Sequence, residues 1–244
     1  MTEAETGKPQ KRIVVRPNGP YRVEGGIPLV RKTQVVSEYG EPLTWKTEGQ
    51  IETEEPYFLC RCGHSQDKPF CDGMHKKVGF DGTETADTGN TADRQVIYPG
   101  GVNIVVKRDY SLCCESGYCA TRETDIEKLT PQTGDTLIRS QVMAMIERCP
   151  SGSFAYSLEE GGEDIEPDYP QQIAVTTEIT DEGPIQGPLW VTGNIPVERS
   201  DGKPLETRNR VTLCCCGLSK NKPLCDGAHR AAETERLRQQ KGKQ

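Results

Sequence analysis

A sixteen-residue segment occurs twice in this chain of 244 residues, and this repeat constrains the fold more than any other feature. Residues 60–75 read CRCGHSQDKPFCDGMH and residues 214–229 read CCCGLSKNKPLCDGAH, so that 10 of 16 positions are identical without a gap. The similarity extends upstream, because GPYRVEGGIPL from Gly19 is similar to GPLWVTGNIPV from Gly187. A repeat of this length indicates a duplicated domain.

Each segment carries three cysteines and one histidine in the same order. One residue separates the first two cysteines, eight precede the third, and three more precede the histidine. Thiolate and imidazole are ligands of zinc and of iron-sulfur clusters, and four of them in so short a loop can surround one small metal centre. The spacing alone leaves both kinds of site open.

The two segments resemble the CDGSH iron-sulfur domain, the mitoNEET-like family, whose motif is C-x-C-x2-S/T-x3-P-x-C-D-G-x-H. Every fixed position of that motif is present twice, and Met74 and Ala228 replace only the Ser, which is not a ligand. The resemblance implies one 2Fe-2S cluster in each copy. The implied ligands are Cys60, Cys62, Cys71, His75 and Cys214, Cys216, Cys225, His229.

Composition argues against one large core, because only 33% of the residues are hydrophobic and the mean hydropathy is -0.68. Short runs of Val, Ile and aromatic residues broken by Gly and Pro predict small β-rich units of the α+β class. The resemblance implies a strand-exchanged dimer, here within one chain as an intramolecular pseudo-dimer. We expect a first copy (10–80), a middle unit (95–158), a second copy (172–232) and a polar tail (233–244).

Smaller signals mark the connections. Asp72 and Asp226 each precede a Gly and can cap a helix that begins there. The polar stretches that start at Phe80 and Glu159 are expected to be linkers, and the tail is expected to be a short solvated helix.

The middle unit contains Cys113, Cys114, Cys119 and Cys149, the last followed by Pro150. It resembles a single-cluster bacterial ferredoxin, in which C-x2-C-x2-C is followed, after a helix and strand, by a distant C-P. Cys113, Cys119 and Cys149 match the first, third and last ligands, whereas Ser116 occupies the second. The resemblance implies either a 3Fe-4S cluster on these three cysteines or a 4Fe-4S cluster completed by Cys114, Ser116 or an exogenous ligand.

Other residues in these segments are expected to have structural roles. Cys215 and its counterpart Arg61 should point away from the cluster, because side chains alternate along an extended backbone. His64 is expected to lie on the surface or to support the site rather than to bind metal, because its counterpart in the second copy is Leu218, which cannot be a ligand. The spacing of the apolar residues Val142, Met145 and Ile146 predicts one buried helical face that leads to Cys149.

The eleven cysteines fall in three groups, which suits metal ligation better than disulfides. No apolar run resembles a signal peptide or a membrane span, so we expect a cytoplasmic protein that does not bind a membrane. A net charge of -7 with both signs intermixed gives no basic face for nucleic acid.

These features predict a multi-cluster one-electron carrier whose partners are a reductase and an acceptor enzyme. The alternative is a donor of labile clusters to apo iron-sulfur proteins, or a redox sensor, because a histidine ligand can be protonated near neutral pH. We do not expect an enzyme, since the sequence has no Ser-His-Asp set, no P-loop and no dinucleotide-binding glycine pattern. The only feature that leaves room for catalysis is a middle cluster in which one iron lacks a thiolate ligand and could bind a substrate.

Overall fold

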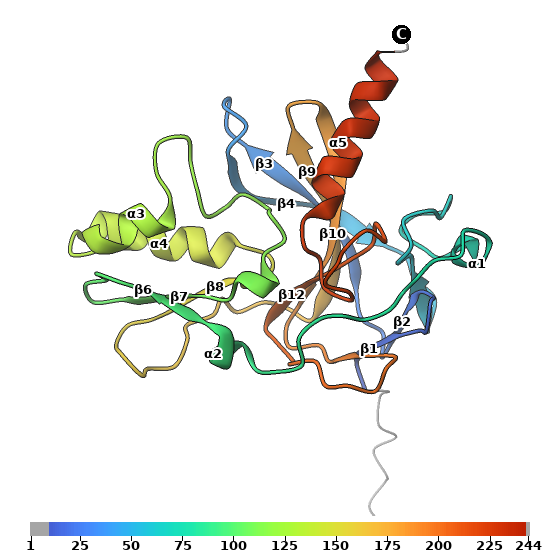
Figure 1. Ribbon diagram of the computed structural model, residues 1–244, viewed down its shortest axis with the longest axis horizontal. Coiled ribbons are helices and arrows are strands. Elements are labelled where there is room, and N and C mark those ends of the chain that lie inside the picture. Colours follow the sequence, from blue (N-terminus) through green and yellow to red (C-terminus); the bar gives the residue numbers. More distant parts are fainter. Residues whose placement is uncertain (1–9, 243–244) are drawn as a thin grey trace, which may run out of the picture.

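The computed structural model describes residues 10–242, which form three small sheets bordered by helices (Figure 1). The expected α+β class with small β-rich units is confirmed. The prediction that no leader is present falls on residues 1–9, which, like 243–244, lie outside the described residues. None of the described helices is both long and apolar enough to span a membrane.

Each copy contains the same three antiparallel strands, as the short apolar runs predict. Alternate side chains such as Ile13 and Val15 point into a common core, as the two-residue period of a strand requires. The strands are β1 (Arg12–Val15), β2 (Tyr21–Glu24) and β5 (Tyr57–Leu59) in the first copy, and β9 (Gln172–Thr180), β10 (Gly183–Thr192) and β12 (Arg210–Leu213) in the second.

Each copy also contributes a strand to the sheet of the other. β11 (Val197–Glu198) of the second copy pairs in parallel with β1, with Val197 opposite Ile13. β3 (Leu29–Val36) of the first copy pairs in parallel with β9, with Leu29 opposite Ile173. Because these are equivalent positions of the repeat, the exchange is reciprocal, and one apolar core underlies both copies.

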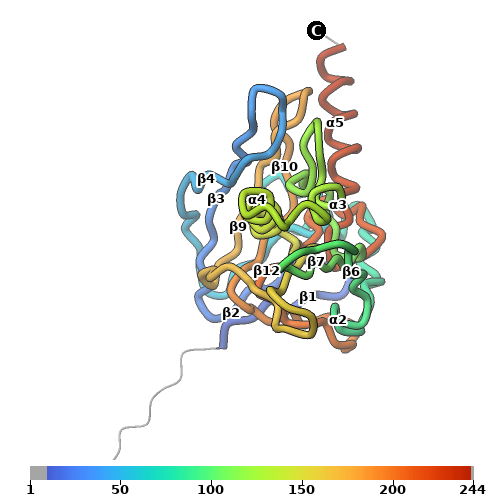
Figure 2. Tube along the Cα trace, turned by 90° about the vertical axis from the view of Figure 1, so that its left-hand side faces the viewer, coloured from blue at the N-terminus to red at the C-terminus, as the bar shows by residue number. Residues whose placement is uncertain are grey.

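The longer connection of the first copy is the strand β4 (Pro42–Ile51), which forms a hairpin with β3. Figure 2 shows this hairpin beside the hairpin β9–β10, and the two complete one five-stranded sheet in the order β12-β10-β9-β3-β4.

The middle unit has its own sheet and its own apolar core. The predicted buried face of Val142, Met145 and Ile146 is confirmed. The unit differs from the ferredoxin resemblance, because helical turns and no strand connect Cys119 to Cys149 in this described segment. Its elements are β6 (Val96–Tyr98), β7 (Val105–Arg108), η1 (Tyr110–Leu112), α3 (Ile126–Leu129), η2 (Thr130–Gln132), α4 (Thr136–Arg148) and β8 (Phe154–Ser157).

Capping explains why helical turns replace the expected strand. The carboxylates of Asp125 and Asp135 accept hydrogen bonds from the backbone N–H groups of Lys128 and Leu137, so each stabilises the start of a helix.

The stretch that follows Phe80 is irregular, but the expectation of a simple linker is wrong. The N–H groups of Thr85 and Ala86 donate to the carbonyl of Lys222 at 2.8 and 2.9 Å, and Ala86 is part of the shared core. The stretch after Glu159 is also attached, because the Tyr169 hydroxyl donates to the carbonyl of Glu147 at 2.8 Å. Polar composition failed as a guide because the contacts are made by the backbone in the first stretch and by a single tyrosine side chain in the second.

The three remaining helices lie outside the middle unit. α1 (Met74–Lys77) is a single turn, and α2 (Thr91–Arg94) precedes the middle unit. The tail forms a longer helix than expected, since α5 (Ala228–Lys241) begins inside the second repeated segment.

Candidate iron-sulfur sites

The first candidate site brings its four expected ligands together as two pairs. Cys60 follows β5, and its Sγ lies 3.8 Å from the Sγ of Cys62. The Sγ of Cys71 lies 3.3 Å from Nδ1 of His75, which is in the single turn α1.

The second candidate site repeats this geometry. The Sγ atoms of Cys214 and Cys216 are 3.8 Å apart, and the Sγ of Cys225 lies 3.4 Å from Nδ1 of His229. In both sites Nδ1 is therefore the imidazole atom that faces the thiolates.

This pairing fits two metal ions per site better than one. Two ligands of one tetrahedral ion stand roughly 3.5–3.8 Å apart when the metal–ligand bonds are about 2.0–2.3 Å. The two sulfur–sulfur pairs, at 3.8 Å, match that separation, and the two sulfur–nitrogen pairs, at 3.3 and 3.4 Å, are slightly shorter. Within residues 10–242, no three His, Cys, Asp or Glu side chains converge on a point where a single metal ion would fit. A 2Fe-2S cluster needs two protein ligands on each of two irons, so the residues fit this group.

The same local hydrogen bonds shape both ligand loops. Asp72 accepts from the N–H groups of Gln66 and Met74 at 2.8 and 3.0 Å. The N-cap residue of α1 is Gly73, so Asp72 stabilises the start of this helix from the position before the cap. Asp226 makes the equivalent bonds with Lys220 and Ala228 at 2.8 and 3.1 Å. Each carboxylate therefore ties the middle of its loop to the turn that holds the histidine.

The residues between the first two ligands point away from the sites, as predicted. Cys215 lies in the shared core, and its thiol donates to the carbonyl of Gly187 at 3.1 Å. The Arg61 side chain is buried, and its guanidinium donates to the carbonyl of Gly82 at 2.7 Å. His64 is exposed on the surface.

Burial and mutual contact shift the acidity of the free thiols. Burial raises the pKa of Cys62 to about 11 and raises that of Cys225 well above its usual range. The hydrogen bond from the Cys216 thiol lowers the pKa of Cys214 to about 6. Since metal ligation requires thiolates, loading these sites must release protons.

The middle unit places its four cysteines around one small cleft. Ser116, at the position of the absent ligand, also lines it. The Arg108 guanidinium lies 3.8 Å from the Sγ of Cys113 and can offset thiolate charge. The cysteines that line the cleft are Cys113, Cys114, Cys119 and Cys149.

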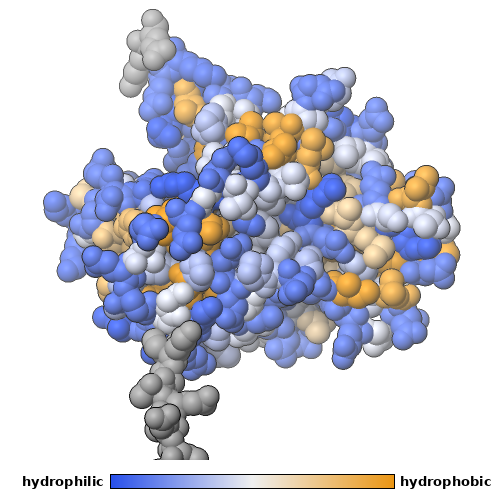
Figure 3. Space-filling model, turned by 180° about the vertical axis from the view of Figure 1, so that it is seen from behind, coloured by the Kyte–Doolittle hydropathy of each residue, from blue (hydrophilic) through white to orange (hydrophobic). Residues whose placement is uncertain are grey.

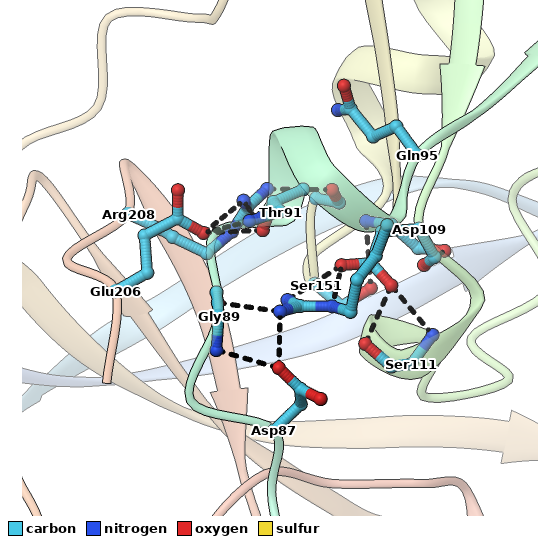
Figure 4. A network of polar contacts seen from close by, with 12 residues as sticks. Asp87, Gly89, Thr91, Gln95, Asp109, Ser111, Ser151, Glu206 and Arg208 are labelled. Carbon is cyan, nitrogen blue, oxygen red and sulfur yellow. Dashed lines mark hydrogen bonds and ion pairs between the residues drawn. The ribbon is translucent and has the colours of Figure 1, made fainter. Parts of the chain in front are cut away.

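A polar network holds the loop that begins at Cys113 (Figure 4). The carboxylate of Asp109 accepts from the N–H of Ser111 at 2.9 Å and so caps the short helix η1, which ends at Cys113. Arg94 pairs with Asp109 at 2.9 Å and with Asp87 at 2.9 Å, so it ties this cap to the stretch that crosses the second copy.

The middle cleft adjoins the second site. A Cβ atom at Gly227, in the second ligand loop, would lie 2.6 Å from Cγ of Glu115, which is in the middle loop. Asn221 donates to the carbonyl of Ser111 at 2.7 Å. The first site is remote from the middle unit, since α1 and α4 lie toward opposite ends of the molecule in Figure 1.

Sequence reasoning missed two charged residues at these sites. Glu178 is completely buried, with Oε2 3.3 Å from Nε2 of His229, and Arg108 lies beside Cys113. An acidic residue inside the strand-like run IAVTTEI was the available signal for Glu178. Arg108 left no such signal, because its approach to the cleft depends on how β7 packs.

Two regions of the chain, residues 18–76 and 186–230, match the family described as "Iron-binding zinc finger CDGSH type". Each region contains all four cysteine and histidine residues of one candidate site. No curated protein matches the chain. The chain thus has two CDGSH-type domains and is an iron-sulfur protein.

Proposed function

Because the chain carries two iron-binding domains of the CDGSH type, we propose that it is a multi-cluster one-electron carrier. The observation that carries this proposal is the succession of three cysteine-rich sites within one folded chain. The middle cleft adjoins the second site, and the second site adjoins the first through the pairing of Cys62 with Cys216. Such a succession suits a relay.

Each CDGSH-type site is proposed to hold one 2Fe-2S cluster on three cysteines and one histidine. The paired ligand geometry supports this proposal over a single zinc ion. When bound, the clusters supply the capacity to accept and release one electron at a time. The chain supplies thiolates and imidazole nitrogens, and burial limits access of water to the second site.

The reciprocal exchange of β3 and β11 supports the proposal that the two copies form an intramolecular pseudo-dimer. Equivalent residues make equivalent contacts at both joints, as a local two-fold axis would require.

A third cluster is proposed in the middle cleft, as in a ferredoxin-like unit. Three cysteines at ferredoxin-like spacing, Cys113, Cys119 and Cys149, line the cleft, and Arg108 can offset negative charge. The cluster is 3Fe-4S with these three ligands, or 4Fe-4S if Cys114, Ser116 or an exogenous ligand completes it.

We propose that the partners are a reductase and an acceptor protein and that the chain is not itself an enzyme. Figure 3 shows a mainly hydrophilic face with scattered apolar patches, and the net charge of -7 suits partners that offer a basic face.

A second candidate function is cluster donation, and one observation favours it. His75 is only half-buried, in a single helical turn without buried residues, so water reaches the ligand whose protonation would release the cluster. Donation would then proceed from the first site.

The deciding experiment is anaerobic purification followed by iron, sulfide and zinc analysis and by electron paramagnetic resonance of oxidised and dithionite-reduced protein. About seven irons with an oxidised-state signal indicate two 2Fe-2S clusters and one 3Fe-4S cluster, and about eight indicate 4Fe-4S. About four would contradict the middle cluster, and stoichiometric zinc without sulfide would contradict the proposal.

Mixing the loaded protein with an apo ferredoxin separates the two functions. A carrier reduces an oxidised acceptor but keeps its iron, whereas a donor loses iron to the apo protein.

A further inference from the structure

The two CDGSH-type sites share their ligand geometry but differ in their surroundings. In the second site, Cys214, Cys225 and His229 are only 1–2% exposed. In the first site, Cys71 and His75 are both partly exposed. A buried site disfavours the additional negative charge that reduction brings, because that charge loses contact with water.

Glu178 adds a second difference. Its side chain is completely buried, and Oε2 lies 3.3 Å from Nε2 of His229, although without the alignment of a hydrogen bond. Arg230, on the surface side, pairs with the same oxygen, whereas Oε1 has no hydrogen-bond partner within residues 10–242. A carboxylate behind a ligating imidazole orients the ring and increases its electron donation to the metal.

The first site lacks this feature for a topological reason. Ile13 of β1 is equivalent to Ile173 of β9, but β1 ends at Val15 and the chain turns back toward β2. β9 continues to residue 180, and Glu178 lies in this extension. No strand residue of the first copy, as far as the structure describes it, occupies the corresponding place.

Glu178 also lies on the side of the second site that faces the middle unit. Gln34 connects the two regions, because its side chain donates to the carbonyl of Ser116 at 3.0 Å and accepts from the N–H of Ile179 at 3.2 Å. Burial raises the pKa of Cys114, and the charges of Cys149 and Glu178 raise it further. The spatial order is therefore middle cleft, Glu178, second site, first site.

We propose that Glu178 is a positioning residue for His229 that, together with burial, holds the second site at a lower reduction potential than the less buried first site. This inference rests on the proposed electron-carrier function. An electron supplied by a one-electron reductant then passes from the second site to the first. This transfer oxidises the second site and reduces the first, and no covalent bond changes. The first site is then the one that donates the electron to the acceptor protein.

The test is a reductive titration of the loaded full-length protein, followed by electron paramagnetic resonance. Separate His75→Cys and His229→Cys variants assign the signals, because each alters only the spectrum of its own site. We expect an electron shared between the two sites to favour the first at least tenfold, which corresponds to a gap of about 59 mV for one electron.

Glu178→Gln removes the charge but keeps the shape of the side chain. We expect it to raise the potential of the second site only and to reduce the tenfold preference. Glu182→Gln is the matched control, because this partly exposed carboxylate of the same hairpin is also paired with cations, Arg238 and Lys241, and should shift neither potential.

Two results would overturn the inference: reduction of the second site before the first in the unmodified protein, or equal potentials in Glu178→Gln and the unmodified chain. The first result needs no Glu178 variant, so the inference remains testable if Glu178→Gln does not fold. Absence of the clusters would instead contradict the proposed function itself.

Discussion

Cys62 and Cys216, the second cysteines of the two candidate sites, are partners in an isolated antiparallel bridge. The ligand loops of the two copies therefore meet directly, and a disturbance at this bridge should reach both sites. The glycine after each cysteine permits the approach. Gly63 and Gly217 both have a φ of +80°, and a Cβ at either position would lie within 2.4–2.6 Å of the opposite carbonyl oxygen.

Gly63→Ala is expected to destabilise the fold by more than about 3 kcal/mol and to lower the iron content of both sites. The methyl group would meet the backbone of Cys216, which cannot move aside as a flexible side chain would. Chemical denaturation and iron analysis measure the two effects. Gly202→Ala is the control, since Gly202 has a φ of +71° with open space around it, and should cost about 1 kcal/mol. Equal losses in the two variants would contradict the role of the bridge.

Cys215→Ala should retain the full complement of iron. This cysteine lies between two ligands in sequence, but its side chain packs in the shared core. We expect a loss of about 1 kcal/mol in stability from the small cavity and no change in the visible spectrum. Cys214→Ala, one residue earlier, should abolish the cluster of the second site. Loss of iron in Cys215→Ala that exceeds its loss of folded protein would show that Cys215 is a ligand.

The sequence predicted the local features of this protein well. The repeat identified two sets of four residues that the structure brings together, and alternation along the strand predicted that Cys215 would point away from its site. The helical period predicted that Val142, Met145 and Ile146 are buried. These features depend on residues close together in the chain, where steric rules and periodicity decide the outcome.

Features that depend on distant contacts were harder to predict. Glu178 reaches His229 because β9 extends beyond the length of β1, and neither segment alone indicates that difference. The stretch that contains Ala86 is polar enough to predict a linker, yet its backbone donates to Lys222, 136 positions away in sequence (222 − 86). Strand length and backbone pairing across the chain are tertiary properties, which local composition does not encode.

Acid should loosen the contact between α2, which precedes the middle unit, and the second copy. Burial raises the pKa of Glu206, but hydrogen bonds from Thr91 and the charge of Arg208 outweigh it, so the pKa is lowered from 4.5. A lowered pKa in the folded state means that this contribution to stability is complete above about pH 4.5 and is lost as the pH falls through the folded-state value.

Urea denaturation between pH 3 and pH 6, compared with Glu206→Gln, isolates this contribution. The variant should lose stability at pH 6 and show a weaker dependence on pH below about pH 4.5. Glu163→Gln serves as the control, because this exposed carboxylate has no ion pair within the described residues. A dependence on pH that is the same in Glu206→Gln and the unmodified protein would exclude the contact as its source.

Ile146→Ala should destabilise the middle unit without affecting the two CDGSH-type domains. Ile146 is fully buried in the core of the middle unit, in the helix α4 that ends at Cys149, and its truncation should cost the unit about 2–5 kcal/mol. The shared core of the two copies contains none of the α4 side chains, so the two CDGSH-type sites should keep their iron. Iron analysis and electron paramagnetic resonance should therefore show selective loss of the proposed middle cluster. Equal loss of all clusters would mean that Arg210, which donates to the carbonyls of Ile146 and Cys149 at 3.0 and 3.1 Å, couples the two cores into one cooperative unit.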